Sequence, residues 1–523
     1  MKELRTVLRW TSRTLLVLLA ILALFILEEN IRGHIMLTRY KAELRVKGEK
    51  LILTELNLPV PSKEGVGNVE LIAAGQELND LQRSNRFSVW YATRLRWNSP
   101  DRPIVRCQQP DLGVRRLDVP ARTGGRGRRP VKDMTETNSN ELAEQNAATS
   151  QPLQASWADL AEEVSAATSA LAHVRSALAK GVVAFPIDYS QGFDARLPHW
   201  KETQNIPIWL ALTGLYELHA NNLDAAIQNI SLLTALTRID HDGRFVIAQH
   251  RRIGTGERGL DLTWEALQAP GWNDSQLARL QEIWQMDDGL LGMIAALETE
   301  RGIRVTYIEK VRGSFPEWQK LRRSLLSKAQ CGCEDLPNDI AVSLYVTLWR
   351  VAWMDQDELL LLKHYQSLLE ATRNVMTGQA WQNVYHPPPQ IPSFLHYGDL
   401  SRYFCAQFFE PSVESTALKA MQFETRRQMT LTAIALKRFG LQHGRLPADL
   451  RELVPEFLTE LPRDYMTDQP LRYHLGADGT FRLYSVGNDG RDDGGDPRPT
   501  QGKRLITIWD GRDAVWPQPA LER

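Results

Sequence analysis

Four aspartates and four glycines share the thirteen residues YSVGNDGRDDGGD, residues 484–496. A hard cation such as calcium takes several oxygen ligands, and glycines let a loop curl around it. Aspartate and glycine also tolerate tight turns, so a polar hairpin turn is the alternative interpretation. Four carboxylates without a counter-ion repel one another, which favours a bound cation over an empty loop.

A second group of carboxylates lies in LETERG, where Glu298 and Glu300 precede Arg301. Paired carboxylates can act as general acid and base, so one hypothesis is a hydrolase with an acidic cleft in a helical domain. Residues two positions apart point to different faces of a helix, however. A solvated or ion-paired helix surface is therefore the competing interpretation.

Gly254, Gly256 and Gly259 in IGTGERGL match the pattern GxGxxG. A true dinucleotide fingerprint follows a strand, opens a helix and belongs to a βαβ unit. FVIA just upstream could be a strand, but the surrounding sequence has helical periodicity and no βαβ alternation. We therefore expect a loop between two helices here, with no bound cofactor.

Other signatures of catalysis are weak. His250, His364 and His396 stand alone, without the spacing of a zinc site. The sequence contains no serine-hydrolase elbow, phosphate-binding loop or Cys-His signature, so it does not indicate an enzyme. The cysteines form no metal-ligand pattern, and both free thiols and a disulfide in an oxidising compartment remain open for them. They are Cys107, Cys331, Cys333 and Cys405.

The overall charge argues against a nucleic-acid partner. Lys and Arg number 62 and Asp and Glu 63, for a formal net charge of -1. Residues 101–130 do hold eight arginines, but no aromatic residues are interleaved for base stacking. A polar stretch with few large apolar residues follows. We predict a flexible linker over residues 101–152.

The amino terminus predicts a membrane anchor. Lys2, Arg5, Arg9 and Arg13 precede an unbroken apolar run over residues 15–27, which ends at Glu28 without a small-x-small cleavage site. A helix that includes the preceding residues reaches the ~20 residues that span a bilayer. The positive-inside rule then keeps the basic leader in the cytoplasm and exports the rest.

Helical periodicity dominates residues 153–384. A single apolar stripe with steps of three and four begins at Trp157, after a Ser156 placed to cap the helix. IPIWLALTGLYELHA and LDAAIQNISLLTALTRI flank a turn at Asn221 and predict a helical hairpin of the tetratricopeptide type. Further helices are predicted over SQLARLQEIW, over LLGMIAALETERGIRVTYIEKV and over residues 341–372. Charges interrupt the last one, which predicts a buried core helix and no second span.

The carboxyl-terminal part predicts a small α+β domain. Prolines at 387–389 and 392 mark a boundary, and a long helix over residues 415–443 follows it. LRYHL and TFRLYSV alternate in polarity around the turn GADG, which predicts a β-hairpin that leads into the acidic loop.

These segments, LPRD and YSVGNDGRDDGGD above all, resemble the globular domain of the major pseudopilin of type II secretion over residues 430–497. The resemblance implies calcium bound by two aspartates seven residues apart and by nearby backbone carbonyls. The aspartates would be Asp489 and Asp496, and the carbonyls those of Val486 and Asn488. Asp492 and Asp493 would add a ligand or only charge. A role in a type II secretion or pilus-like assembly is a second implication.

The layout of the whole chain also resembles that of uncharacterised bacterial membrane-anchored proteins. The shared features are an anchor that ends in EN-x-R-G (Glu29, Asn30, Arg32 and Gly33 here), LETERG in a helical middle part, and a closing VWPQP. This likeness implies architecture and no activity.

We therefore expect a mainly α protein with one amino-terminal transmembrane helix, a helical middle domain and a small α+β domain. The predicted parts are a leader and anchor (1–34), a juxtamembrane segment (35–100), the linker (101–152), the helical domain (153–384), a proline-rich boundary (385–395) and the carboxyl-terminal domain (396–523). The expected function is that of a non-enzymatic interaction or scaffold protein in the bacterial inner membrane, facing the periplasm, with a calcium-stabilised carboxyl-terminal domain.

Overall fold

The computed structural model describes residues 2–59, 65–84, 157–180, 183–239, 243–286, 289–329, 343–386, 404–467, 469–499 and 507–516. The predicted linker, His396, most of the proline-rich boundary and three of the cysteines (Cys107, Cys331 and Cys333) lie outside these residues. Within them the chain is mainly helical, as expected, with a few short strands.

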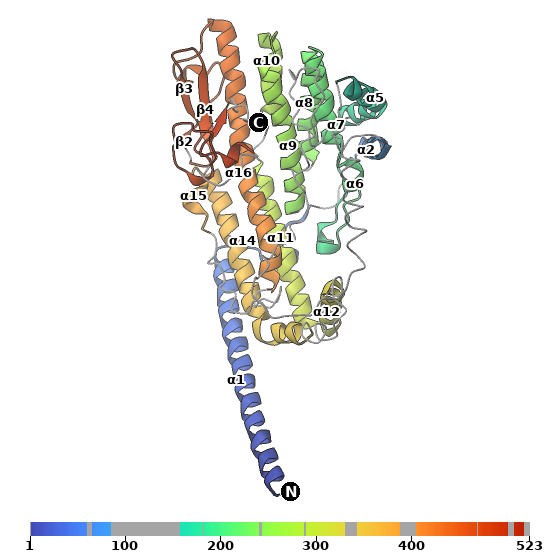
Figure 1. Cartoon of the computed structure of the whole chain (residues 1–523), viewed down its shortest axis with the longest axis vertical. Helices are drawn as coiled ribbons and strands as arrows, with labels where there is room; N and C mark the ends of the chain where they lie inside the picture. The colour runs from blue at the N-terminus through green and yellow to red at the C-terminus, as the bar shows by residue number, and fades with distance from the viewer. Residues whose placement is uncertain are drawn as a thin grey trace, which may run out of the picture.

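One long helix and a helical body make up the molecule (Figure 1). The longer helices are α1 (Lys2–Val46), α2 (Asn68–Ser84), α5 (Trp157–Ala179), α7 (Ile206–His219), α8 (Leu223–Ile239), α9 (Val246–Gln268), α10 (Asp274–Trp284), α11 (Leu290–Gly313), α12 (Phe315–Ala329), α14 (Met354–Met376) and α16 (Phe404–His443). The short helices α6 (Trp200–Thr203) and α15 (Trp381–Val384) connect them.

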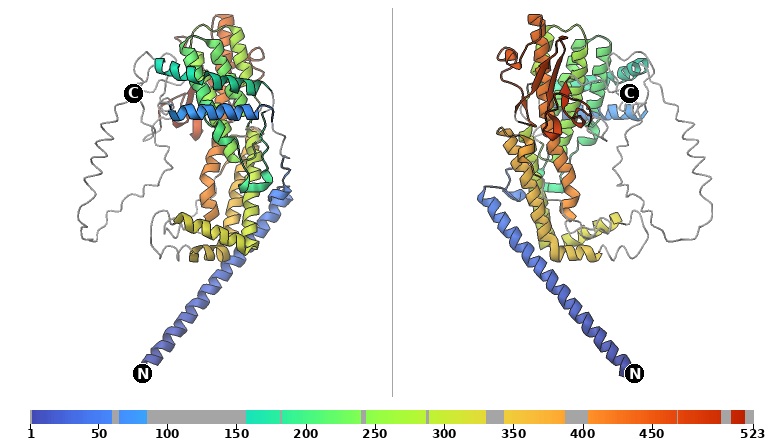
Figure 2. Two further views of the ribbon diagram at one scale, coloured as in Figure 1. Left: turned by 90° about the vertical axis from the view of Figure 1, so that its right-hand side faces the viewer. Right: turned by 60° about the vertical axis from the view of Figure 1, so that its left-hand side comes forward.

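Helix α1 projects from the body with its amino-terminal half and docks on the body with its carboxyl-terminal half (Figure 2). Its apolar run is exposed, with Leu16 at 65% and Leu24 at 66%, whereas Leu44 is fully buried. By length and composition it is the one helix among the described residues that could cross a membrane. The helix is unbroken from Lys2 to Val46, so the expected division between residues 34 and 35 falls inside it.

The predicted helical hairpin and apolar stripe are both present. Helices α7 and α8 pack along each other, and Asn221 between them has a left-handed φ of 60°, a conformation that asparagine tolerates at a helix end. The stripe on α5 faces α2 and α7. Its buried members include Trp157, Leu160, Val164, Ala167, Leu171 and Val174.

The prediction of a loop at the GxGxxG segment is wrong, because its three glycines lie in the middle of α9. The FVIA segment likewise enters the first turn of that helix and forms no strand. A Cβ at Gly256 would overlap the ring of Phe423, and one at Gly259 would lie 3.0 Å from Trp284. The small residues therefore let α9 approach α16 closely and leave room for the ring of Trp284 from α10, which is a packing role.

Helices α10, α11 and α14 lie where the periodicity predicts them. A capping box starts α10, in which Asn273 and Gln276 exchange hydrogen bonds between side chain and backbone. The helix expected over residues 341–372 is described from Ser343 and contains a π-helical segment, Trp349–Trp353, just before α14. Asp357 and Glu358 in α14 are buried, as expected of a core helix.

Helix α16 is part of the helical body. It packs on α9, α10 and α14, and its side chains join the same hydrophobic core. The predicted hairpin is present as β3 (Arg472–Leu475) and β4 (Phe481–Ser485), and β5 (Ala514–Trp516) extends the sheet on the other side of β4. All three strands are antiparallel, with Arg472 opposite Tyr484 and Leu483 opposite Trp516. Two-residue strands β1 (Arg463–Asp464) and β2 (Gln469–Pro470) pair beside them.

Candidate functional site

The acidic loop leaves β4 through a short 3-10 helix, Gly487–Asp489. All four of its glycines have left-handed φ values between 70° and 75°, which a residue with a Cβ adopts only with strain. A Cβ at Gly495 would overlap Arg482 of β4. Glycine is therefore required here for the loop to fold back on its own strand.

Arginines neutralise two of the aspartates. Asp492 accepts a hydrogen bond from Nε of Arg472 on β3 at 2.6 Å and one from the hydroxyl of Tyr484 at 3.1 Å. Asp496 pairs with Nη2 of Arg498 at 2.8 Å and with Nη1 of Arg512 at 3.6 Å. The hydrogen bonds from Arg498 lower the pKa of Asp496. The protein itself therefore supplies counter-charges to two of the four aspartates of the loop.

A residue that the sequence did not point to holds the loop together. The carboxylate of Asp513, a fully buried residue just before β5, accepts hydrogen bonds from the backbone N–H groups of Gly495 at 2.7 Å and Asp496 at 3.0 Å. Burial raises the pKa of Asp513, and these N–H groups oppose that rise. No local pattern marks this contact, because the partners are about seventeen residues apart and meet only through the sheet.

The two segments that carry the pseudopilin resemblance touch each other. Asp464 of LPRD is buried, and its carboxylate accepts the N–H of Met466 at 3.0 Å. Hydrogen bonds from the Ser485 side chain and the Val486 backbone also reach this carboxylate, while burial raises its pKa. Asp464 thereby ties the turn after β1 to the start of the acidic loop.

The remaining predicted ligands do not converge on one point. Asp489 accepts the N–H of Arg491 at 3.0 Å, and the Asn488 side chain bridges Gln422 and the carbonyl of Trp509. Val486 is buried, whereas Asp493 is exposed. Across the described ranges, no group of three or more His, Cys, Asp or Glu side chains is arranged to hold a metal ion. The residues do not form an oxygen cage in this conformation, and calcium binding stays a prediction.

The LETERG carboxylates are ion-paired. Glu298 accepts a hydrogen bond from Nη2 of Arg373 on α14 at 2.7 Å. Glu300 pairs with Nη2 of Arg304 at 2.7 Å and accepts the backbone N–H of Val246 at 2.9 Å. These contacts agree with the ion-paired interpretation, and they leave no pair of carboxylates facing an open cleft.

Arg301 of the same motif has the most consequential contacts. It is fully buried and donates hydrogen bonds to Glu49 at 2.8 Å, to the carbonyl of Lys50 at 2.9 Å and to Gln366 at 2.6 Å. Burial acts to raise the pKa of Glu49, but hydrogen bonds from Arg373, Arg301 and Gln366 hold it at about 2. LETERG therefore clamps the segment that follows α1.

The EN-x-R-G motif also contacts the body. Asn30 donates a hydrogen bond to the carbonyl of Val351 at 2.8 Å, and Gln356 donates one to the carbonyl of Glu29 at 3.0 Å. A Cβ at Gly33 would lie 2.9 Å from Gln356. Two motifs of the whole-chain resemblance, EN-x-R-G and LETERG, thus lie at the joint between anchor and body, a location that the sequence did not predict.

Of the three histidines singled out in the sequence, His250 and His364 lie in the described part of the chain. His250 lies beside the Thr416 hydroxyl at 3.3 Å, and His364 is buried in α14, where burial lowers its pKa to about 4. They lie on different helices, α9 and α14.

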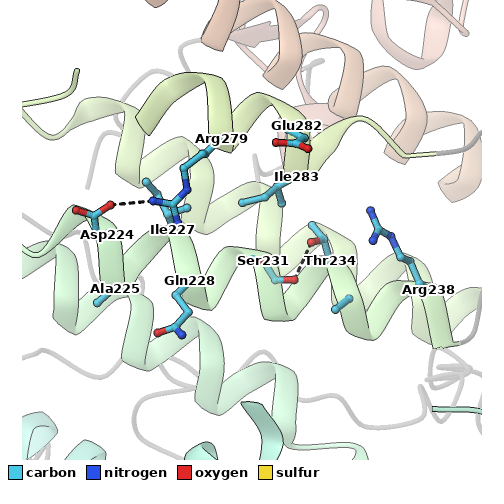
Figure 3. A pocket seen from close by; sticks show the side chains of 11 residues that line it. Asp224, Ala225, Ile227, Gln228, Ser231, Thr234, Arg238, Arg279, Glu282 and Ile283 are labelled. Carbon is cyan, nitrogen blue, oxygen red and sulfur yellow. Dashed lines mark hydrogen bonds and ion pairs between the residues drawn. The ribbon is translucent and has the colours of Figure 1, made fainter. Parts of the chain in front are cut away.

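A groove of about 590 Å³ runs between α8 and α10 (Figure 3). Ile227 and Ile283 give it apolar walls, and Asp224 and Arg279 form an exposed ion pair of 3.3 Å at one end. Arg238 lies toward the other end, apart from that pair. The groove combines apolar contact with charges of both signs, as surfaces that bind amphipathic helices do.

Comparisons with protein-family models, with curated proteins and with solved structures find no match to this chain.

Proposed function

We propose that this protein is a membrane-anchored interaction or scaffold protein. The observation that carries the proposal is the change in environment along α1. Residues 15–27 form an apolar helix exposed on its sides, and the same helix then buries Leu37 and Leu44 in the body. An apolar helix that finds no protein cover is stable in hydrocarbon, because its backbone hydrogen bonds are all internal.

The joint supports an uncleaved anchor. The residues just beyond the apolar run, Glu29 and Asn30, remain helical and hydrogen-bonded to the body. The basic leader then remains in the cytoplasm by the positive-inside rule, and the body faces the periplasm of a bacterial inner membrane.

Membrane extraction tests this proposal. The full chain with an amino-terminal and a carboxyl-terminal tag should stay in the pellet after alkaline carbonate treatment and should retain both tags. Protease added from the periplasmic side should remove the carboxyl-terminal tag only. Release of the protein into the supernatant, or loss of the amino-terminal tag, would show a secreted protein with a cleaved signal.

The groove between α8 and α10 is our candidate surface for the protein partner, which by its chemistry would be an amphipathic helix. Apolar side chains of that helix would contact Ile283, which is partly exposed, and an acidic group would meet Arg238. Ile283→Glu should weaken partner binding at least tenfold, whereas Lys201→Glu on α6, outside the groove lining, should not. Equal binding by both variants would remove the groove from the proposal.

Participation in a pseudopilin-type assembly is the second candidate. The contact of Asp464 with the start of the acidic loop supports it, because the two most specific segments of the resemblance fold as one unit. The full chain should then co-purify with pseudopilin-type partners from membranes. Failure to do so, with the groove partner retained, would leave the scaffold role alone. The acidic-cleft hydrolase is not supported, since Glu298 and Glu300 are both ion-paired.

A further inference from the structure

The point at which α1 leaves the helical body determines which end of the body faces the membrane. The apolar run ends at Leu27. Ile26 within it already packs against the body, and the first hydrogen bonds with the body are made at Glu29 and Asn30. The axial rise from Leu27 to Asn30 is only about 4.5 Å at 1.5 Å per residue. The π-helical segment Trp349–Trp353, which these residues contact, must therefore lie at the level of the lipid headgroups if residues 15–27 are in the hydrocarbon.

Helix α12 lies at this same end. Figures 1 and 2 show it at the end of the body from which the free half of α1 projects, with the segment before α14 between the two helices. Its Trp318 is buried and is covered by the guanidinium groups of Arg350, 5.0 Å from the ring centre, and Arg322, 5.8 Å away. These stacking contacts fix α12 to the segment that receives the anchor. We call α12 together with residues 343–353 the membrane-proximal face.

Large apolar side chains are exposed on this face from each of its segments. Phe315 at the start of α12 is 55% exposed, Leu344 is 65% exposed and Val351 is 43% exposed. Two of these residues are held in place by neighbouring groups. Phe315 packs beside Trp318, and the carbonyl of Val351 accepts a hydrogen bond from Asn30. Exposed apolar groups that flank a membrane span favour insertion among lipid headgroups.

The charges of α12 fit the same environment. Its sequence has four basic residues, Lys320, Arg322, Arg323 and Lys328, against one acidic residue, Glu317. Lys320 and Arg323 are exposed, as is Lys310 at the end of α11. Acidic groups nearby are already engaged, since Asp355 and Glu358 pair with Arg312. Among the described side chains of α12, the fully exposed charges, Lys320 and Arg323, are therefore positive, which attracts anionic lipid.

We propose that the membrane-proximal face rests on the bilayer and binds anionic phospholipid headgroups, with Phe315 inserted among them. The proposal rests on the membrane anchor proposed above. The bilayer is the occupant that the position favours, because the face begins within one helical turn of the end of the span. The body would then be held at two places, by the anchor and by this face, which fixes its tilt to the membrane.

Site-specific photo-crosslinking of the full chain tests the proposal. A benzophenone amino acid replaces Phe315 in protein reconstituted into nanodiscs of phosphatidylcholine with phosphatidylglycerol. After illumination, mass spectrometry should detect phospholipid adducts at position 315. The yield should fall at least threefold in phosphatidylcholine alone. It should fall likewise in the variant Lys320→Glu with Arg323→Glu, because the charges that hold the face on the bilayer are lost.

Two further probe positions separate the possible failures. A probe at Leu22, inside the apolar run, should always give lipid adducts. A probe at Leu441, an exposed leucine one turn beyond the Arg438 that pairs with Asp274 of α10 at the far end of the body, should give none. Two results would overturn the inference without affecting the proposal of a membrane anchor. One is lipid adducts at position 22 without any at position 315, and the other is protein adducts at position 315 in native membranes. Absence of adducts at 22 overturns the anchor and this inference together.

Discussion

At the residue scale, one buried charge pair joins two parts of the chain that are 252 residues apart. Arg301 and Glu49 lie together with almost no exposure to solvent, and Arg373 and Gln366 complete the hydrogen bonding of the carboxylate. A buried pair of this kind is weak evidence of net stabilisation, but removal of Arg301 leaves the buried Glu49 with Arg373 as its one remaining arginine partner. The joint between anchor and body therefore depends on both residues.

We predict that Arg301→Ala lowers the free energy of unfolding by about 1.5–3 kcal/mol, because Glu49 loses the charged hydrogen bond from Arg301 but keeps Arg373 and Gln366. Chemical denaturation of the detergent-solubilised full chain, followed by circular dichroism, measures the change. Arg279→Ala is the matched control, since its ion pair with Asp224 is exposed. The control should change stability by less than about 1 kcal/mol. Equal effects of the two changes would contradict the clamp.

Acid should weaken the same joint. The pKa of Glu49 is about 2 in the folded protein, below its ordinary 4.5, so the unfolded chain binds a proton first as the pH falls. The contribution of Glu49 to stability is therefore present above pH 4.5 and is lost between 4.5 and about 2. Melting temperature against pH should fall less steeply over this range for Glu49→Gln than for the wild type. Parallel curves for the two proteins would contradict a contribution of Glu49 to the pH dependence of stability.

The acidic loop gives two opposed expectations. The resemblance predicts a higher melting temperature in calcium than in chelator, and loss of that difference in the Asp489→Ala, Asp496→Ala double variant. The arginine pairs predict no difference, and a lower melting temperature for Arg472→Ala, which frees Asp492 of its counter-charge. The arginine pairs oppose Asp492 and Asp496, so the melting temperatures in calcium and in chelator decide between the two expectations. A calcium-dependent rise in the full chain would restore the metal site.

At the element scale, glycines decide how closely helices approach. The GxGxxG segment does so inside α9, where two of its glycines face Phe423 and Trp284 and the third, Gly254, has only an ordinary contact with Arg258. The pattern that resembles a nucleotide fingerprint therefore serves helix packing. A helix seam needs small residues for the same steric reason as a phosphate loop does, which is why the two share this glycine pattern.

We predict that Gly256→Ala destabilises the protein by about 1–3 kcal/mol through overpacking against Phe423. Gly254→Ala should instead be neutral or stabilising by up to about 1 kcal/mol, because alanine is the better helix former and the site has room. Thermal melting of the two variants provides the comparison. A loss of stability in both would mean that backbone freedom at these positions matters more than space.

At the scale of the whole molecule, α1 has two roles along one unbroken helix. Its first part reaches into the membrane in our proposal, and its second part contributes Leu37 and Leu44 to the core of the body. The body therefore depends on residues that belong, by position in the sequence, to the anchor.

Truncation measures this dependence. A chain that begins at residue 29 keeps the docked part of α1 and the Glu49 clamp, and it should be folded in solution without detergent, with a melting temperature near that of the full chain. A chain that begins at residue 50 loses Leu37, Leu44 and Glu49 together, and it should aggregate or melt at a much lower temperature. Size-exclusion chromatography with thermal melting checks both. Similar behaviour of the two chains would contradict the dual role of α1.

The sequence by itself determined the elements whose signals are local. Apolar residues with helical spacing predicted α5, α7, α8, α10 and α11, and alternation around GADG predicted the β3–β4 hairpin, because side-chain direction repeats with backbone geometry. Only the tertiary structure decided which charged groups meet. Asp513 with the acidic loop, Arg301 with Glu49, and α16 with the helices before it are pairings across the fold. Such contacts cannot be predicted from a residue's neighbours in the chain, because they depend on how the elements pack. The location of LETERG and EN-x-R-G at the joint between anchor and body is therefore known only from the tertiary structure.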